Sequence, residues 1–131
     1  MAKEAKGSNA TFTGSNKGLT IIGDHAYAFS GDILAGSTGQ AATTMLEFQS
    51  PKGYIKGVLS FCEENIAADN VFFRVFLNNV SVINVAYDGS PPYTNINYPI
   101  LIPPNTLVTV KWGCSTNDEI GTAWFTGKVY S

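Results

Sequence analysis

Hydrophobic and polar residues alternate with a period of two over most of the chain. The clearest stretch is residues 71–87, VFFRVFLNNVSVINVAY. Such alternation is typical of a β-strand, because successive side chains point to opposite faces of a sheet. In the middle of the stretch, Asn78 and Asn79 tolerate the positive φ that a two-residue hairpin turn requires. The pattern therefore predicts a β-hairpin around which the other strands are organised.

The first strand of this hairpin is apolar on both faces. Val71, Phe73 and Val75 can fill a core, whereas Phe72 and Phe76 point to the opposite side. These two phenylalanines need a cover of their own, which is either another layer of the same chain or a neighbouring subunit.

Short alternating segments separated by Gly, Pro, Asn and Ser occupy most of the remaining chain. In one of them, His25, Tyr27, Phe29 and Ile33 fall on one face. Only residues 63–70 have any helical character, and they are too few for more than a turn or a loop. The further predicted strands are residues 19–22, 25–34, 42–48, 54–62, 98–102, 106–114 and 120–130.

This succession of strands predicts an all-β fold, a two-sheet antiparallel β-sandwich. A single jelly roll of eight to nine strands accommodates the pattern most naturally. An immunoglobulin-like sandwich is the main rival, but its Cys…Trp…Cys core pattern is missing, because Trp112 lies only two residues before Cys114.

Two parts of the chain differ in composition. Residues 18–131 have the length and apolar content of one jelly-roll β-sandwich domain. Residues 1–17 are small and polar, with Phe12 as their only aromatic residue, and are expected to form a flexible N-terminal arm. The arm is either a frayed terminus or a strap that orders on a neighbouring subunit with Phe12 as its anchor.

Composition restricts the kinds of molecule that this chain is expected to bind. Charged residues make up only 14% of the chain, which leaves more neutral surface for contacts with protein. The formal net charge is −2 and the eight basic residues are scattered, so a nucleic-acid-binding footprint is not expected. No apolar run reaches transmembrane length, and the N-terminus lacks the apolar segment of a secretion signal. We therefore expect neither nucleic acid nor a membrane as a partner.

No catalytic site is predicted. The single histidine, His25, follows Asp24 directly, and on an extended strand the two side chains would point to opposite faces and could not pair. Neither Cys62 nor Cys114 is flanked by residues that would activate a thiol, and we expect both to be reduced and partly buried. The chain is therefore expected not to be an enzyme.

Metal and cofactor sites are not predicted either. One histidine and two distant cysteines are too few for a zinc site, and the phosphate-binding glycine patterns are absent. Glu63, Glu64 and Asp69 could in principle hold calcium, but a solvated acidic loop is the simpler interpretation.

Aromatic residues beside polar ones offer a possible sugar-binding platform. Tyr93, Asn95, Asn97 and Tyr98 lie in or beside a loop rich in Pro and Asn. The competing interpretation is that the tyrosines pack this loop onto the sandwich or against another subunit. A carbohydrate-binding, lectin-like module or the receptor-binding head of a viral fibre is therefore the alternative function.

The last third of the chain carries a family resemblance. Residues 98–114 (YPILIPPNTLVTVKWGC) and residues 121–130 (GTAWFTGKVY) place a Pro-Pro turn between strands and end on a closing strand. This succession resembles the C-terminal part of small β-sandwich (jelly-roll) bacteriophage virion proteins of the capsid decoration or cement type. Residues 23–33 and 43–48 are similar to the same group.

The resemblance implies a non-enzymatic virion structural protein. It would be a decoration or cement protein or a small jelly-roll capsid subunit, assembled in the host cytoplasm and located on the capsid surface. The implied partners are further copies of the chain in a homotrimer and a major capsid protein. On this basis, apolar interface contacts are expected from Phe12, Phe72, Phe76, Trp124 and Tyr130. A third possibility is a hydrolase that depends on His25, but no catalytic pattern in the sequence supports it.

Overall fold

The computed structural model describes residues 18–34, 43–64, 70–88, 95–114 and 120–130. Phe12, Asp69 and Tyr93 lie outside these residues. The described part of the chain forms ten β-strands and no helix. The strands are β1 (Thr20–Ile22), β2 (His25–Phe29), β3 (Ile33–Leu34), β4 (Thr43–Gln49), β5 (Tyr54–Glu64), β6 (Asn70–Leu77), β7 (Val80–Asp88), β8 (Asn95–Ile102), β9 (Leu107–Cys114) and β10 (Ile120–Tyr130).

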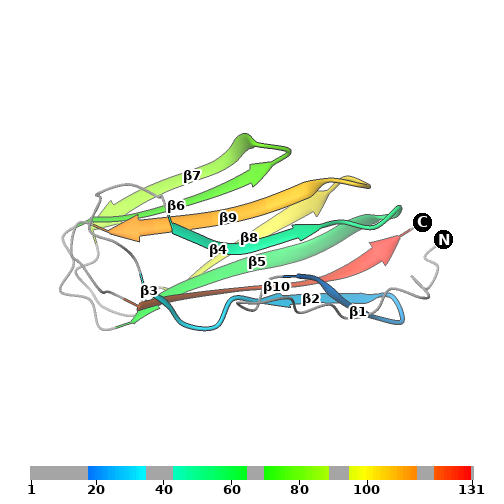
Figure 1. Cartoon of the computed structure of the whole chain (residues 1–131), viewed down its shortest axis with the longest axis horizontal. Helices are drawn as coiled ribbons and strands as arrows, with labels where there is room; N and C mark the ends of the chain where they lie inside the picture. Colours follow the sequence, from blue (N-terminus) through cyan, green and yellow to red (C-terminus); the bar gives the residue numbers. More distant parts are fainter. Residues whose placement is uncertain (1–17, 35–42, 65–69, 89–94, 115–119, 131) are drawn as a thin grey trace.

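The strands form two antiparallel sheets. The larger sheet has the order β1-β2-β10-β5-β8, with β3 also paired to β10, and the smaller sheet has the order β4-β9-β6-β7 (Figure 1). The pairings are nested: β6 pairs with β7, β5 with β8, β4 with β9, and β2 with β10. A long hairpin whose strand pairs are rolled alternately into two sheets has this nesting, and it defines a jelly roll. The predicted two-sheet antiparallel β-sandwich is confirmed, with ten strands in the described residues where eight to nine were predicted.

The predicted hairpin turn joins β6 to β7, the innermost pair of the nested strands. Asn78 and Asn79 have φ values of 50° and 66°. Asn78 is also fixed to the neighbouring strand, because its Oδ1 accepts a hydrogen bond of 2.9 Å from the backbone N–H of Leu107. The turn therefore both reverses the chain and attaches the hairpin to β9.

The core lies between the two sheets and is built around aromatic rings from both. The ring of Phe61 on β5 has its centroid 4.7 Å from that of Phe73 on β6 and 5.6 Å from that of Trp112 on β9. Phe125 on β10 faces Phe48 on β4 with 5.6 Å between the centroids. The face predicted to fill the core in β6 is confirmed, because Val71, Phe73 and Val75 are fully buried.

The predicted strand 25–34 was wrong as a single element. Gly31 has a φ of 69°, and the chain leaves the sheet between β2 and β3. As a result Phe29 points outward, whereas Ile33 packs against the core. The two residues therefore lie on opposite faces, although simple alternation had placed them together.

Two further expectations need correction. Strand β8 begins at Asn95, three residues earlier than predicted, so Asn95 and Asn97 belong to a strand and not to a loop. Glu63, expected in a solvated acidic loop, lies in β5 and is fully buried. Because β5 runs to Glu64, the alternation that buries Phe61 also turns Glu63 inward.

Both cysteines are thiols, as expected, and Cys114 is buried whereas Cys62 is half-buried. No helix in the described part of the chain is long and apolar enough to span a bilayer.

Candidate functional site: the outer face of the larger sheet

The outer face of the larger sheet consists of the side chains that alternate with its core residues. On β10, Ala123, Phe125 and Val129 point into the core, so the residues between them point outward. The register then places outward residues of neighbouring strands side by side, as with Trp124 opposite Phe29. The outward residues are Thr20 and Ile22 on β1, His25, Tyr27 and Phe29 on β2, Leu34 on β3, Tyr54, Lys56, Val58, Ser60 and Cys62 on β5, Asn97, Pro99 and Leu101 on β8, and Ile120, Thr122, Trp124, Thr126, Lys128 and Tyr130 on β10.

This face carries most of the exposed large hydrophobic side chains in the described residues. Seven of the nine lie on it, and the other two, Val80 and Val82, lie on β7 of the smaller sheet. The seven are Ile22, Tyr27, Phe29, Leu34, Tyr54, Val58 and Leu101. Their exposed fractions correspond to roughly 500–700 Å², taking a fully exposed side chain of this size as roughly 150–200 Å². The largest contiguous apolar patch of a typical monomer is about 300–600 Å², and these seven side chains reach that size only when the whole face is counted, because Ile22 and Leu101 are paired with His25 and Lys56.

The end of the face near β3 forms what we call the contact patch, defined as Phe29, Leu34, Ile120 and Trp124. Phe29 and Leu34 are more than half exposed, and Trp124 and Ile120 are half-buried beside them. Leu34 is paired directly with Ile120, and Phe29 with Trp124. The patch thus consists of two cross-strand pairs, Leu34–Ile120 and Phe29–Trp124, which lie four residues apart along β10 with Thr122 between them.

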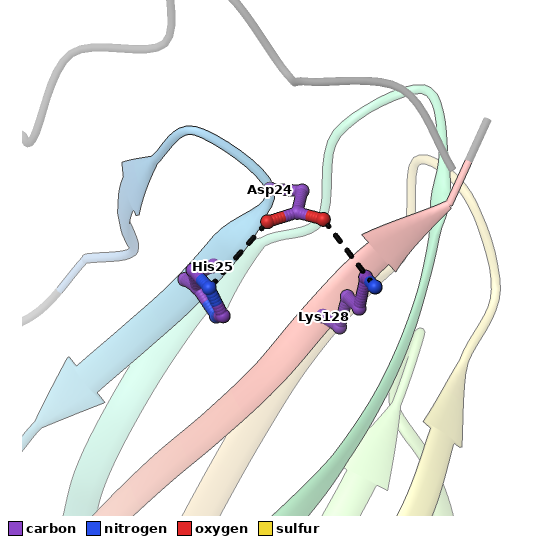
Figure 2. Close-up of polar contacts among 3 residues, drawn as sticks. All are labelled: Asp24, His25 and Lys128. Carbon is purple, nitrogen blue, oxygen red and sulfur yellow. Dashed lines mark ion pairs between the residues drawn. The ribbon is translucent and has the colours of Figure 1, made fainter.

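The opposite end of the face, near the turn between β1 and β2, carries charged groups. Asp24 Oδ1 lies 3.5 Å from His25 Nε2, and Asp24 Oδ2 lies 3.6 Å from Lys128 Nζ (Figure 2). The expectation that Asp24 and His25 could not pair was wrong. Asp24 belongs to a turn and not to an extended strand, because Gly23 has a φ of 62° and redirects the chain. The Asp24 carbonyl also accepts a 2.7 Å hydrogen bond from the N–H of Val129, which fixes the turn beside β10.

Aromatic rings flank these charged groups. The rings of Tyr54 and Tyr130 are stacked, with centroids 5.1 Å apart and an interplanar angle of 14°. Lys128 Nζ lies 5.6 Å from the centroid of the Tyr130 ring, and the ring of His25 is stacked at 6.4 Å on that of Tyr27. Aromatic and charged side chains thus touch one another across three strands.

The residues predicted as interface contacts do not share one surface. Trp124 and Tyr130 lie on the outer face of the larger sheet, whereas Phe72 and Phe76 are half-buried on the outer side of the smaller sheet. The Phe76 ring is partly covered from within the chain, because Lys111 Nζ lies 5.6 Å from its centroid. Phe12 lies outside the described residues.

The residues predicted as a sugar platform do not converge either. Asn97 points outward, and its Oδ1 accepts a 2.6 Å hydrogen bond from the Ser60 hydroxyl. Tyr98 points to the other side of the sheet, where its ring stacks at 6.4 Å on Phe73. Asn95 begins β8, and Tyr93 lies outside the described residues. The fold therefore separates Asn97 from Tyr98 by the thickness of the sheet.

Lys56, Lys128 and Tyr54 lie close together on this face, and their proximity was not predicted from the sequence. Each sits at an outward position of a predicted strand, so its exposure could be foreseen from the alternation. Their proximity could not, because it depends on the register of β5 against β10. Among the described residues, no group of three His, Cys, Asp or Glu side chains could hold a metal ion.

No protein-family model matches the chain, and no curated protein matches it. Solved structures with a similar fold include the VP2 protein of the infectious bursal disease virus subviral particle. That comparison has a TM-score of 0.51 and 7% identity, and it covers 84% of this chain and 35% of VP2. A family 35 carbohydrate-binding module from Clostridium thermocellum has a TM-score of 0.45 and 13% identity, with 77% of this chain and 90% of that chain covered.

A Podospora anserina β-(1,4)-mannanase that carries a family 35 module has a TM-score of 0.48 and 16% identity, with 82% of this chain and 28% of that chain covered. The chain thus spans about a third of VP2 and less of the mannanase. At 7% identity, the comparison with VP2 shows a similar fold alone.

Proposed function

We propose that this chain is a non-enzymatic structural protein of a virus particle, of the decoration or cement type or a small jelly-roll capsid subunit. In this proposal it acts on the capsid surface through protein–protein contacts. Its partners are other copies of the chain, in a homotrimer, and a major capsid protein. The resemblance of residues 98–130 to small phage virion proteins supports the class, and the fold shared with a viral capsid protein is compatible with it.

The single observation that carries the proposal is the contact patch. Exposed hydrophobic residues scattered singly are normal on a soluble protein, but a group of them on one sheet face marks an interaction surface. Phe29 and Trp124 are paired on β2 and β10, and Leu34 and Ile120 form a second pair on the same face, so no rearrangement is needed to present them. A partner that covers them gains about 25 cal/mol for each Å² of apolar surface removed from water.

Many copies on one particle would strengthen a weak single contact. The apolar area of the patch alone is modest compared with the roughly 800 Å² per partner of a standard interface. Once one subunit of a homotrimer has bound the capsid, the other subunits are already held close to it, and their binding raises the overall affinity. The N-terminal arm, with Phe12 as its anchor, would add a second contact.

Solution mass tests the proposal. Light scattering at several concentrations is expected to give a trimer for the full chain and a weaker trimer for a chain that begins at Gly18. Phe29→Lys is expected to shift the full chain toward the monomer, because the substitution places a charge in the covered patch. Val82→Lys is the matched control, because Val82 is 48% exposed on the other sheet and Phe29 is 51% exposed. A monomer at every concentration, together with no attachment to capsids of the source virus, contradicts the proposal.

A carbohydrate-binding module is the second candidate function, and one observation favours it. The stacked rings of Tyr54 and Tyr130 lie on an open sheet face beside charged groups, an arrangement that suits a sugar ring. This location differs from the predicted set of Tyr93, Asn95, Asn97 and Tyr98. A glycan array with Tyr54→Ala beside the unmodified protein tests it, and binding that is indifferent to Tyr54 contradicts it.

A further inference from the structure

A row of basic side chains crosses the outer face of the larger sheet. Lys128 on β10 is directly opposite Lys56 on β5 and directly opposite His25 on β2. Neighbouring strands of a sheet are about 4.8 Å apart, so these three side chains are immediate neighbours. We call Lys56, Lys128 and His25 the cationic row. All three are exposed.

The charge of the row is only partly compensated. Asp24 is the one carboxylate in the described residues that pairs with it, at 3.6 Å from Lys128 and 3.5 Å from His25. Lys56 forms no ion pair with any described residue. Like charges directly opposite each other destabilise a sheet. A local arrangement that costs stability without a compensating gain in the folded chain is typical of a functional site.

Tyrosine rings border the row on both sides. Tyr54 and Tyr130 form the next pair along β5 and β10 in one direction, and Tyr27 follows His25 on β2 in the other. Tyr54 is 38% exposed and Tyr27 is 43% exposed, so a ligand on the row can reach both rings. The rings are held on paired strands and by stacking contacts, which keeps the platform rigid.

We propose that the cationic row and its tyrosines bind an acidic saccharide, one that carries carboxylate or sulfate groups. The acidic group would lie between Lys56 and Lys128, where it relieves their repulsion. The apolar face of the sugar ring would pack on Tyr54, and Asp24 would accept hydrogen bonds from sugar hydroxyls. This inference refines the second candidate function from sugars in general to acidic ones, and it does not depend on the trimer.

The same chemistry argues against a nucleic acid as the ligand. Single-stranded nucleic acids also use basic and aromatic side chains, but they need a positively charged groove along several phosphates. Here Lys56, Lys128 and His25 form one short row across three strands, which suits a single acidic group and not a run of successive phosphates. The Asp24 carboxylate beside the row can accept hydrogen bonds from the several hydroxyl groups of a sugar.

The row is separate from the contact patch. His25 and Phe29 are four residues apart on β2, which is about 13 Å along a strand. A protein contact at the β3 end therefore leaves the charged end of the same face available.

The test is a titration of the full chain, followed by nuclear magnetic resonance, with four probes. The probes are an oligogalacturonate, a heparin-derived oligosaccharide, a neutral maltooligosaccharide and an oligothymidylate. The two acidic oligosaccharides are expected to bind and to shift resonances of β2, β5 and β10. Lys56→Gln is expected to weaken this binding about two- to fivefold, and the double variant with Lys128→Gln about tenfold. Tyr54→Ala should weaken it as well.

Lys52→Gln is the matched control. It removes the same charge from an exposed turn residue outside the face, and it is expected to leave binding unchanged. The melting temperature of each variant shows whether it is folded. Equal losses for Lys52→Gln and Lys56→Gln would mean that the attraction is only general charge, which overturns the site.

The other outcomes separate the two proposals. Equal binding of the neutral probe overturns the acidic class but leaves a carbohydrate-binding module standing. Binding of neither kind of saccharide overturns both. Tighter binding of oligothymidylate with the same dependence on Lys56 overturns the saccharide assignment.

Discussion

Gly57 on β5 and Gly127 on β10 lie directly opposite each other, and the ring of Phe125 occupies the space that their side chains would fill. A Cβ added to Gly57 would lie 2.7 Å from Phe125 Cζ, and one added to Gly127 would lie 3.0 Å from the same atom. The pair of glycines thus leaves room for a large core ring beneath the charged end of the larger sheet.

Gly57→Ala should therefore destabilise the protein. The added methyl group would also lie 2.3 Å from the backbone carbonyl oxygen of Thr126, which cannot move without disturbing the ladder. Overpacking of this kind typically costs about 1–3 kcal/mol in the free energy of unfolding. Urea denaturation measures the loss, and Thr126→Ala, an outward substitution at the same place, should change stability far less. Equal effects of the two substitutions would contradict this packing.

Phe73→Ala and Phe72→Ala should differ strongly although the residues are adjacent. Phe73 is fully buried between Phe61 and Tyr98, so its truncation should cost about 3–5 kcal/mol. Phe72 is half-buried on the outer side, and its loss in a monomer should cost roughly 1 kcal/mol. Chemical denaturation of both variants at the same low concentration tests the difference. A comparable loss for Phe72→Ala would mean that the outer side of the smaller sheet is covered.

The hairpin turn should respond differently to glycine at its two positions. Asn79→Gly should leave stability within about 0.5 kcal/mol or raise it, because glycine adopts the positive φ of 66° without strain. Asn78→Gly should lower stability by about 1 kcal/mol, because the N–H of Leu107 loses its side-chain acceptor. Thermal unfolding compares the two. Equal effects would show that the bond from Leu107 to Asn78 contributes little.

Ser50→Ala should be costly for a small change in volume. The buried Ser50 hydroxyl accepts a 2.8 Å hydrogen bond from the N–H of Thr106 and donates a 2.7 Å bond to the carbonyl of Pro103. Without it the buried N–H of Thr106 loses that acceptor, a cost of about 1–3 kcal/mol. Hydrogen exchange at the Thr106 amide and the melting temperature report the effect, with Gln49→Ala, at an exposed neighbouring position, as the control. Unchanged protection at Thr106 would show that another group replaces the hydroxyl.

The strands of this protein were readable from the sequence because their signals are local. Alternation identified β5, β6, β9 and β10 and the inward residues of β6, and Asn78-Asn79 marked the turn at the tip of the jelly roll. The predictions were wrong where a single residue changes the direction of the chain. Gly23 brought Asp24 beside His25, and Gly31 put Ile33 and Phe29 on opposite faces.

The candidate site was decided by the tertiary structure. Lys56, Lys128 and His25 are each an ordinary outward residue of a strand, and only the register of β2, β10 and β5 makes them one row. The same pairing brings Tyr54 and Tyr130 into contact, whereas the pleat of β8 separates Asn97 from its neighbour Tyr98. Alternation along a strand depends on backbone geometry that every residue shares. Register between strands depends instead on how distant side chains fill a common core, and that information is spread over the whole chain.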